Sequence, residues 1–144
     1  MAALTEGRNT PEALGPDREG PVAAAETIFE GAMVMIDASG NLVRGKTATG
    51  LTGAGVAQAR ADNAAGAAGA IAARYRPGIF RLANSAGADE ITAADIGKAA
   101  WAVDDQTVAR TSAANTRSKA GVVDHVDAFG VWVHLDAALA RLAQ

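Results

Sequence analysis

The chain has 144 residues, a formal net charge of −3 at pH 7 and no cysteine. This length suits one domain with tails. The slightly acidic, mixed charge argues against a general nucleic-acid-binding protein, which needs a basic surface, and the lack of cysteine excludes disulfides and thiolate metal sites. Of the residues, 49% are hydrophobic, but many are alanine and only six are aromatic, so we expect a thin core that association with other chains helps to stabilise. The sequence has no stretch of about twenty apolar residues, so it predicts neither a membrane span nor a membrane partner.

Residues 1–21 contain several prolines and charges and almost no large apolar side chain. Such a segment cannot bury enough surface to fold alone, so we predict an extended N-terminal arm that is either disordered or ordered on a partner. Its candidate contact residues are Arg8, Pro11, Pro16 and Arg18.

From residue 22 onward the pattern predicts short strands separated by turns rich in glycine. The expected strands of this part cover residues 28–29, 33–36, 42–44, 56–60, 71–75 and 79–82, with loops at 50–55 and 62–69. Residues 37–41 carry a strong turn signal between two strands and so predict a hairpin.

Arg74, Arg76 and Arg81 lie close together in the sequence, on either side of a predicted bend at Pro77 and Gly78. A local basic cluster of this kind is either a solvated strand face or a docking site for an acidic partner, because arginine makes bidentate contacts with carboxylates.

Thr92 and Asp95 have the spacing of a capping box, which predicts one helical turn that stops at Gly97. Strands at 100–103 and 106–111 are then expected to form a hairpin across Asp104 and Asp105. Pairing that opposes Val103 to Gln106 or to Val108 would place Trp101, Val103 and Val108 on one face.

A second hairpin is predicted from strands at 121–126 and 131–135, with Val126 opposite Val131 and Gly130 in the turn. This register divides the side chains between two faces. The expected core face carries Val122, Val126, Val131, Val133 and Leu135, and the expected contact face carries Val123, His125, Trp132 and His134. Asp136 is expected to cap a short C-terminal helix whose apolar stripe includes Leu139 and Leu142.

Together these elements predict a mainly β protein, a small antiparallel barrel or sandwich. We divide the chain into an arm at 1–21, a β-barrel domain at 22–136 and a short helix or tail at 137–144.

Residues Gly40–Thr47 match the phosphate-binding pattern G-x-x-x-x-G-K-[ST] and follow an apolar strand. Residues 100–103 followed by Asp104 even imitate the strand and aspartate that hold magnesium in nucleotide hydrolases. However, residues 48–55 carry three glycines and form a poor helix, whereas this motif must open one. A nucleotide-binding domain is therefore an alternative, and a coincidental match is the better account.

Other candidate sites are weaker. Asp124 and His125 are expected to point to opposite faces of a strand, and Val123 is expected to oppose His134, so the histidines predict no metal site. No serine has a histidine at a triad spacing, and Asp104 with Asp105 fits turn chemistry better than acid–base catalysis. We therefore expect no catalytic residues and no cofactor.

The order of segments from about residue 22 to residue 135 resembles the capsid decoration, or cement, proteins of tailed bacteriophages. The segments that carry the resemblance are 31–34 before 37–40, 77–82, 91–92 before 95–98, the hairpin through 103–105, 120–123 and 130–133. No single motif is specific.

This resemblance implies a compact β-barrel or β-tulip, made in the host cytoplasm and bound to the outer surface of the capsid. It implies a structural protein and no enzyme, with the major capsid protein as its partner and a homo-oligomer, a trimer or else a dimer, as its state. The arm and either Trp132 or the three arginines would lie at capsid or subunit contacts. A β-rich module for carbohydrate or another virion component is a third possibility, which exposed aromatic platforms would favour.

Overall fold

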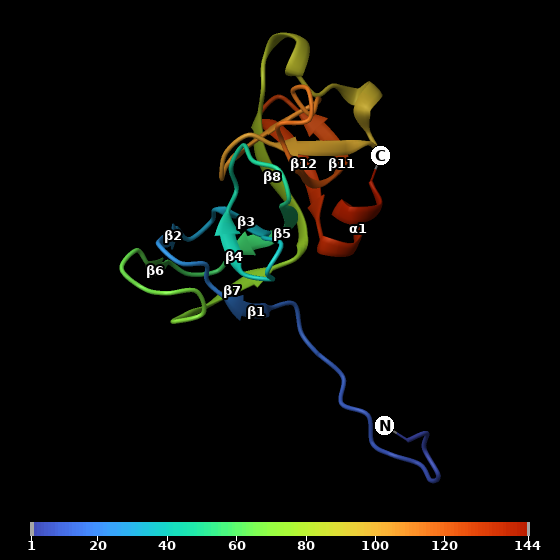
Figure 1. Ribbon diagram of the computed structural model, residues 1–144. Helices are drawn as coiled ribbons and strands as arrows, with labels where there is room; N and C mark the ends of the chain where they lie inside the picture. Colours follow the sequence, from blue (N-terminus) through green and yellow to red (C-terminus); the bar gives the residue numbers. More distant parts are fainter. Residues whose placement is uncertain (1, 144) are drawn as a thin grey trace.

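The computed structural model describes residues 2–143 and shows a mainly β protein with a short C-terminal helix (Figure 1). The strands in the first half are β1 (Arg18–Pro21), β2 (Glu26–Ile28), β3 (Met33–Ile36), β4 (Leu42–Arg44), β5 (Thr52–Ala57), β6 (Ala61–Asn63) and β7 (Ala72–Arg76). The second half contains β8 (Gly78–Asn84), β9 (Ala99–Ala102), β10 (Thr107–Ala109), β11 (Lys119–Asp127) and β12 (Gly130–Leu135). Two single turns of 3-10 helix, η1 (Gly87–Asp89) and η2 (Ala93–Asp95), precede β9, and α1 (Ala137–Leu142) follows β12.

The first half is a curved five-stranded sheet in the order β1-β7-β5-β3-β4, with β2 and β6 paired beside it. Its two edges approach each other directly after β1. Val22 forms a parallel bridge with Leu42 of β4, and the N–H of Ala23 donates to the carbonyl of Leu42 at 2.9 Å. The chain therefore draws the two ends of this sheet together, which hides part of the edges that an open sheet would expose.

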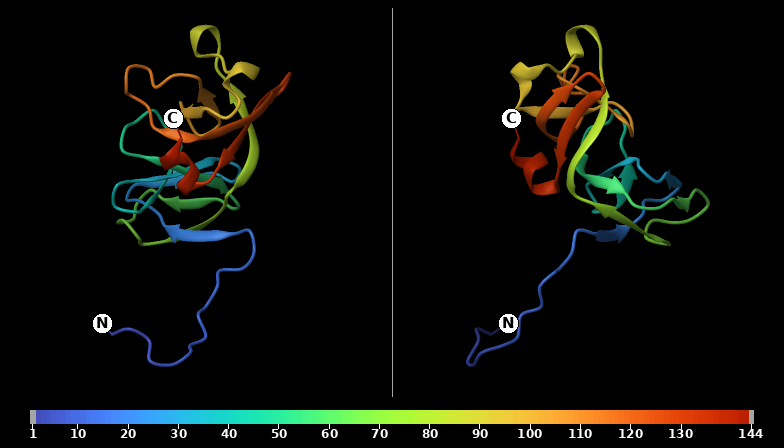
Figure 2. Two further views of the ribbon diagram at one scale, coloured as in Figure 1. Left: turned by 90° about the vertical axis from the view of Figure 1, so that its right-hand side faces the viewer. Right: turned by 180° about the vertical axis from the view of Figure 1, so that it is seen from behind.

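The second half is a closed five-stranded barrel in the order β10-β8-β12-β11-β9, stacked beside the first sheet (Figure 2). The predicted barrel is thus confirmed, with one correction to its strand directions. β8 and β10 run parallel, because the long connection through η1, η2 and β9 lies between them, whereas the other barrel pairs are antiparallel. Closure leaves the barrel with no free edge.

The two halves share one core. Met33 and Met35 of β3 pack in the same buried cluster as Val131 and Val133 of β12, and β7 passes directly into β8 at Pro77. The two halves come close together at β5 and β11, where a Cβ added to Gly53 would lie 1.8 Å from the carbonyl oxygen of Ala120. Only glycine allows the two backbones to lie at this distance.

The first hairpin of the barrel forms as predicted, but its register differs by one residue. Val108 pairs with Ala102 and Ala109 with Trp101, so neither of the two predicted registers is right. A shift of one residue moves each side chain to the opposite face. Val108 is therefore fully buried, whereas Trp101 lies half-buried on the other face, under the ammonium group of Lys119 at 5.8 Å.

The second hairpin has the predicted pair of Val126 with Val131, but the register shifts between Val123 and His125. This β-bulge at Asp124 adds one residue to β11 and exchanges the faces that precede it. Val123 is consequently buried opposite Val133, and Val122 lies outside opposite His134. The prediction placed Val122 in the core and Val123 outside, and both assignments are wrong.

Several boundaries also differ. β1 takes the last four residues of the predicted arm, β5 begins earlier than the strand expected at 56–60, and β6 overlaps the start of the loop expected at 62–69. The capping box at Thr92 and Asp95 and the cap of α1 by Asp136 are confirmed. Leu142 does not join the apolar stripe of α1, because it is exposed and Ala140 is the buried residue of this helix.

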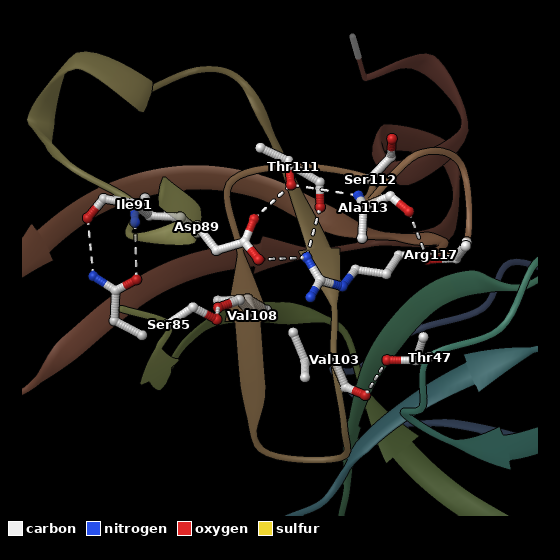
Figure 3. A network of polar contacts seen from close by, with 12 residues as sticks. Thr47, Ser85, Asp89, Ile91, Val103, Val108, Thr111, Ser112, Ala113 and Arg117 are labelled. Atoms are coloured by element: carbon white, nitrogen blue, oxygen red, sulfur yellow. Dashed lines mark hydrogen bonds and ion pairs between the residues drawn. The ribbon is translucent and has the colours of Figure 1, made fainter. Parts of the chain in front are cut away.

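The loop between β10 and β11 contains a left-handed turn. Ala113, Ala114 and Asn115 have φ angles of 48°, 57° and 65°, a conformation that costs an L-residue roughly 1–2 kcal/mol. Its base is held by polar contacts that Figure 3 shows: Asp89 accepts hydrogen bonds from Thr111 and, at 3.1 Å, from Arg117. These contacts keep the turn in place despite its strain.

Gly53→Ala should lower the free energy of unfolding by about 2–3 kcal/mol, because the new methyl group must push β5 away from β11. Gly7→Ala is the control, since nothing lies within 4 Å of a Cβ added there. Urea unfolding followed by circular dichroism measures both. Equal stability of the two variants would show that the halves do not meet at Gly53.

Ala114→Gly should raise the free energy of unfolding by about 1 kcal/mol, because glycine adopts the left-handed conformation without steric cost. Ala86→Gly is the matched control, since Ala86 is exposed but has a φ of −120°. Thermal unfolding of both variants tests the expectation, which fails if Ala114→Gly has a Tm at or below that of the wild type.

Candidate interaction surface

The turn between β11 and β12 is fixed by one carboxylate. Asp127 Oδ1 accepts hydrogen bonds from the N–H groups of Phe129 at 2.7 Å and of Gly130 at 3.1 Å. Gly130 has a φ of +154°, and a Cβ there would lie 2.3 Å from the carbonyl oxygen of Leu82, so glycine is required. The turn leaves the Phe129 side chain 79% exposed.

Beside this turn, three side chains lie next to one another on the outside of the barrel. The register places His125 of β11 opposite Trp132 of β12, and Trp132 opposite Arg81 of β8. The His125 and Trp132 rings stack, with centroids 5.2 Å apart and planes at 12°. The guanidinium of Arg81 lies 5.9 Å from the Trp132 centroid and 5.5 Å from that of Phe129. We call Arg81, His125, Asp127, Phe129 and Trp132 the aromatic ridge.

Asp127 joins the turn to the stack. Its second oxygen, Oδ2, accepts a hydrogen bond from Nε1 of Trp132 at 2.8 Å. This bond is the main reason why the pKa of Asp127 lies below its ordinary value. The N–H groups of Phe129 and Gly130 and the charge of Arg81 lower it further, against a smaller desolvation effect. The carboxylate is therefore ionised at neutral pH, where it holds the indole in one orientation.

The ridge has the chemistry of a protein contact site. Tryptophan and arginine are enriched among the residues that dominate binding energy, and a side chain that is already held loses little entropy on binding. Trp132 is packed between His125 and Arg81, so its ring is not an open platform. The most prominent apolar group that the ridge offers to a partner is Phe129.

The predicted contact residues of the arm are exposed. Arg8, Pro11 and Pro16 lie in the segment 2–17, which forms no strand and extends away from the sheet (Figure 1). Arg18 begins β1, and its guanidinium donates to the carbonyls of Gly15 at 3.1 Å and Asp17 at 3.0 Å.

The three predicted arginines do not form one cluster. Arg81 belongs to the ridge, whereas Arg76 forms an ion pair with Asp17, Nε to Oδ1, at 2.8 Å. This hydrogen bond from Arg76, together with the charges of Arg76 and Arg74, lowers the pKa of Asp17. The bend at Pro77 separates the two groups, because β7 lies in the first sheet and β8 lies in the barrel.

The phosphate-loop match has a different structure from the motif. Gly40 ends a turn, β4 follows, and no helix lies between Thr47 and β5. Lys46 binds Glu26, Nζ to Oε2, at 3.1 Å. Thr47 Oγ1 donates to the carbonyl of Val103 at 2.8 Å. The segment does lie beside the strand end that imitates a magnesium site, as the sequence match requires, but it lacks the helix N-terminus that would bind phosphate.

Residues 2–143 hold no group of three or more His, Asp or Glu side chains placed to bind a metal. The two histidines are separate, since Val122 lies opposite His134. Contrary to the prediction, Asp124 and His125 do meet, Oδ2 to Nδ1 at 2.6 Å, because the bulge alters the alternation of β11. In the part of the chain described here, no helix has the length and hydrophobicity needed to cross a membrane.

Of the ridge residues, Trp132 and Arg81 were predicted from the sequence as contact residues, whereas Asp127 and Phe129 were not. The sequence did contain a signal for this turn. An aspartate that accepts a hydrogen bond from the backbone N–H two residues later, as Asp127 does from Phe129, is typical of an Asx turn. Such a turn projects the residue it caps, so an aromatic residue at that position predicts an exposed contact.

Acidification should release Trp132. Because the folded-state pKa of Asp127 is lowered, the stabilisation from its bonds is complete above the unfolded value of about 3.9 and is lost as the pH falls through the folded value. In a Trp101→Phe background, the Trp132 emission should change within this range. Asp127→Ala should show the low-pH emission already at pH 7, whereas the control Asp105→Ala should not. An emission independent of pH in a chain still folded by circular dichroism would contradict the contact.

In comparisons with known proteins, no family model, no curated protein and no solved structure matches this chain. Its function must therefore be inferred from its own surface and from the resemblance in the order of its segments.

Proposed function

We propose that the chain is a structural virion protein of the capsid decoration type. In this role it binds the outer surface of a phage head and stabilises contacts between major capsid subunits. The observation that carries the proposal is the arm, residues 2–17. It extends from a body made of the closed barrel and the sheet that packs against it (Figures 1 and 2). A long exposed segment that is fixed at one end to a rigid body suits a protein that binds neighbouring subunits through an extended contact surface.

The arm is fixed at its base. β1 pairs with β7 over four residues, and the ion pair between Asp17 and Arg76 lies directly before it. The arm carries apolar side chains that nothing covers, with Leu4 68% and Leu14 80% exposed. Burying such side chains on a partner favours binding by about 1.5–3 kcal/mol each, before the cost of ordering the segment is subtracted.

Modest contacts of this size are sufficient on a particle. In a homo-oligomer each copy contributes one arm, and simultaneous binding of linked arms raises the overall affinity without a new contact. We favour a trimer, with a dimer as the alternative, because both place identical arms around a symmetry axis. The working parts are surfaces rather than a reactive pocket, so the proposed role involves no enzymatic activity, nucleic acid or membrane.

The alternative functions have less support. A nucleotide-binding domain using Gly40–Thr47 would need a helix after Thr47, where the chain instead forms a loop and then β5. A carbohydrate-binding module would need an open aromatic face, but Trp132 is packed between two side chains and Arg81 lies over the exposed ring of Phe129. The chain therefore lacks both the helix that phosphate binding requires and the open aromatic face that carbohydrate binding requires.

Deleting residues 2–14 should leave the body folded but weaken binding to the phage head by at least about tenfold. The deletion keeps Gly15, Asp17 and β1, so the contacts at the base of the arm remain. Binding is measured on heads from which this protein has been removed, by co-sedimentation, with circular dichroism to confirm the fold.

A full-length variant with Leu4→Asp and Leu14→Asp separates the arm's apolar contacts from its length and should show a similar loss. Its control is Leu142→Asp, an exposed leucine on α1. If both arm variants bind and protect the heads against heat as the wild type does, the arm has no role in attachment. If the wild type itself does not bind heads, the decoration role is wrong.

A further inference from the structure

A hollow between the two halves of the fold has a volume that can receive the side chain of Phe129. It lies where the turn between β2 and β3 meets the loop between β9 and β10, and its volume is about 280 Å³. A cavity of about 150 Å³ holds a benzene molecule, so the volume of this hollow, which is open to solvent, is sufficient for a phenyl ring. The lining residues are Phe29, Glu30, Gly31, Ala32, Asp105 and Gln106.

The hollow is preformed by the backbone. The N–H of Met33 donates to the carbonyl of Asp105 at 2.7 Å, which ties its two walls together. Gly31 has a φ of +84°, and its N–H donates to the carbonyl of Ala57 at 3.0 Å. Phe29 remains 49% exposed and provides an apolar wall.

The rim of the hollow is acidic, whereas the aromatic ridge carries the cation Arg81 beside the carboxylate of Asp127, which already accepts three hydrogen bonds. Neither Glu30 nor Asp105 forms an ion pair within residues 2–143, so the rim carries two free carboxylates. The nearby cation, Arg60, lies 5.7 Å from the Phe29 centroid, and its charge is matched by Asp62 at 3.2 Å. On the ridge, Arg81 likewise has no ion-pair partner within the described residues and lies against Phe129.

From this match in size and charge we propose that Phe129 and Arg81 of one copy dock into the hollow of a second copy, with Arg81 facing Glu30 and Asp105. The two surfaces are different parts of the chain, so the contact is head-to-tail. A head-to-tail contact closes into a ring when its rotation permits, and three copies would give the trimer favoured above. The inference rests on the self-association in the proposed function, but not on capsid binding.

The first test is the mass of the full chain in solution, by analytical ultracentrifugation at up to nearly millimolar concentration. Phe129→Ala should weaken self-association by about 30-fold or more, as expected for an anchor residue. Gln106→Trp should do the same by filling the hollow, since Gln106 is exposed on its rim. Leu142→Ala is the control, because Leu142 is 78% exposed, almost as much as Phe129. A monomeric wild type, or an unchanged mass of Phe129→Ala, overturns the proposal.

Mixing the two variants tests the head-to-tail geometry. Phe129→Ala keeps an intact hollow, and Gln106→Trp keeps an intact aromatic ridge. An equimolar mixture should therefore form a 1:1 dimer that neither variant forms alone. Monomers in the mixture, or dimers of one variant alone, would overturn the proposal.

Because the wild type has no cysteine, single cysteines give an independent measurement. Ala128→Cys, which is exposed beside Phe129 and keeps that ring, mixed with Gln106→Cys should give a crossed disulfide under mild oxidation, in excess over either homodimer, and excess homodimer would contradict the contact.

The solution mass and the head-binding assay fail separately. A wild type that forms the ring but does not bind heads would refute the decoration role alone. A monomer that still binds heads through its arm would refute the ring alone.

Discussion

The whole structure depends on the close contact between β5 of the first sheet and β11 of the barrel. Gly53 lets these backbones approach so closely that a methyl group would overlap the carbonyl of Ala120. This proximity allows Met33 and Met35 to enter the cluster that holds Val131 and Val133. A chain rich in alanine has few large side chains with which to fill space, and it gains a shared core by bringing backbones together instead. The candidate surfaces are fixed relative to one another by this same contact.

Hydrogen bonds and ion pairs fix the loops that the thin apolar core does not reach. Ser118 Oγ donates to the carbonyl of Ala48 at 2.7 Å and accepts from the N–H of Leu51 at 3.0 Å, which links the loop before β5 to the start of β11. Asp89 ties η1 to the strained loop through Thr111 and Arg117 (Figure 3). Buried or partly buried polar groups fix one arrangement because every other arrangement leaves them unpaired. Rigidity therefore comes from specific bonds as well as from apolar packing.

The elements that the sequence predicted well are those set by local chemistry. The hairpin after Ile36, the capping box at Thr92 and the cap by Asp136 each depend on residues within a few positions of one another. Features set by distant partners could not be predicted. The bulge at Asp124 follows from pairing of β11 with two neighbours and reversed the faces of Val122 and Val123. The separation of Arg76 from Arg81 likewise follows from the assignment of β7 and β8 to different sheets.

The candidate site could be predicted only in part, because contacts between residues distant in the sequence could not be predicted. Trp132 was noticeable as a large aromatic on an outward face, but its partners lie on two strands, β8 and β11, that only the fold brings to either side of β12. Those partners determine what the site can do. With His125 on one side and Arg81 on another, Trp132 supports its neighbours, and the exposed Phe129 becomes the group available for contact. A rigid ridge loses little entropy on docking, whereas the arm must be ordered when it binds, so the ridge suits a contact between rigid copies and the arm suits an irregular surface.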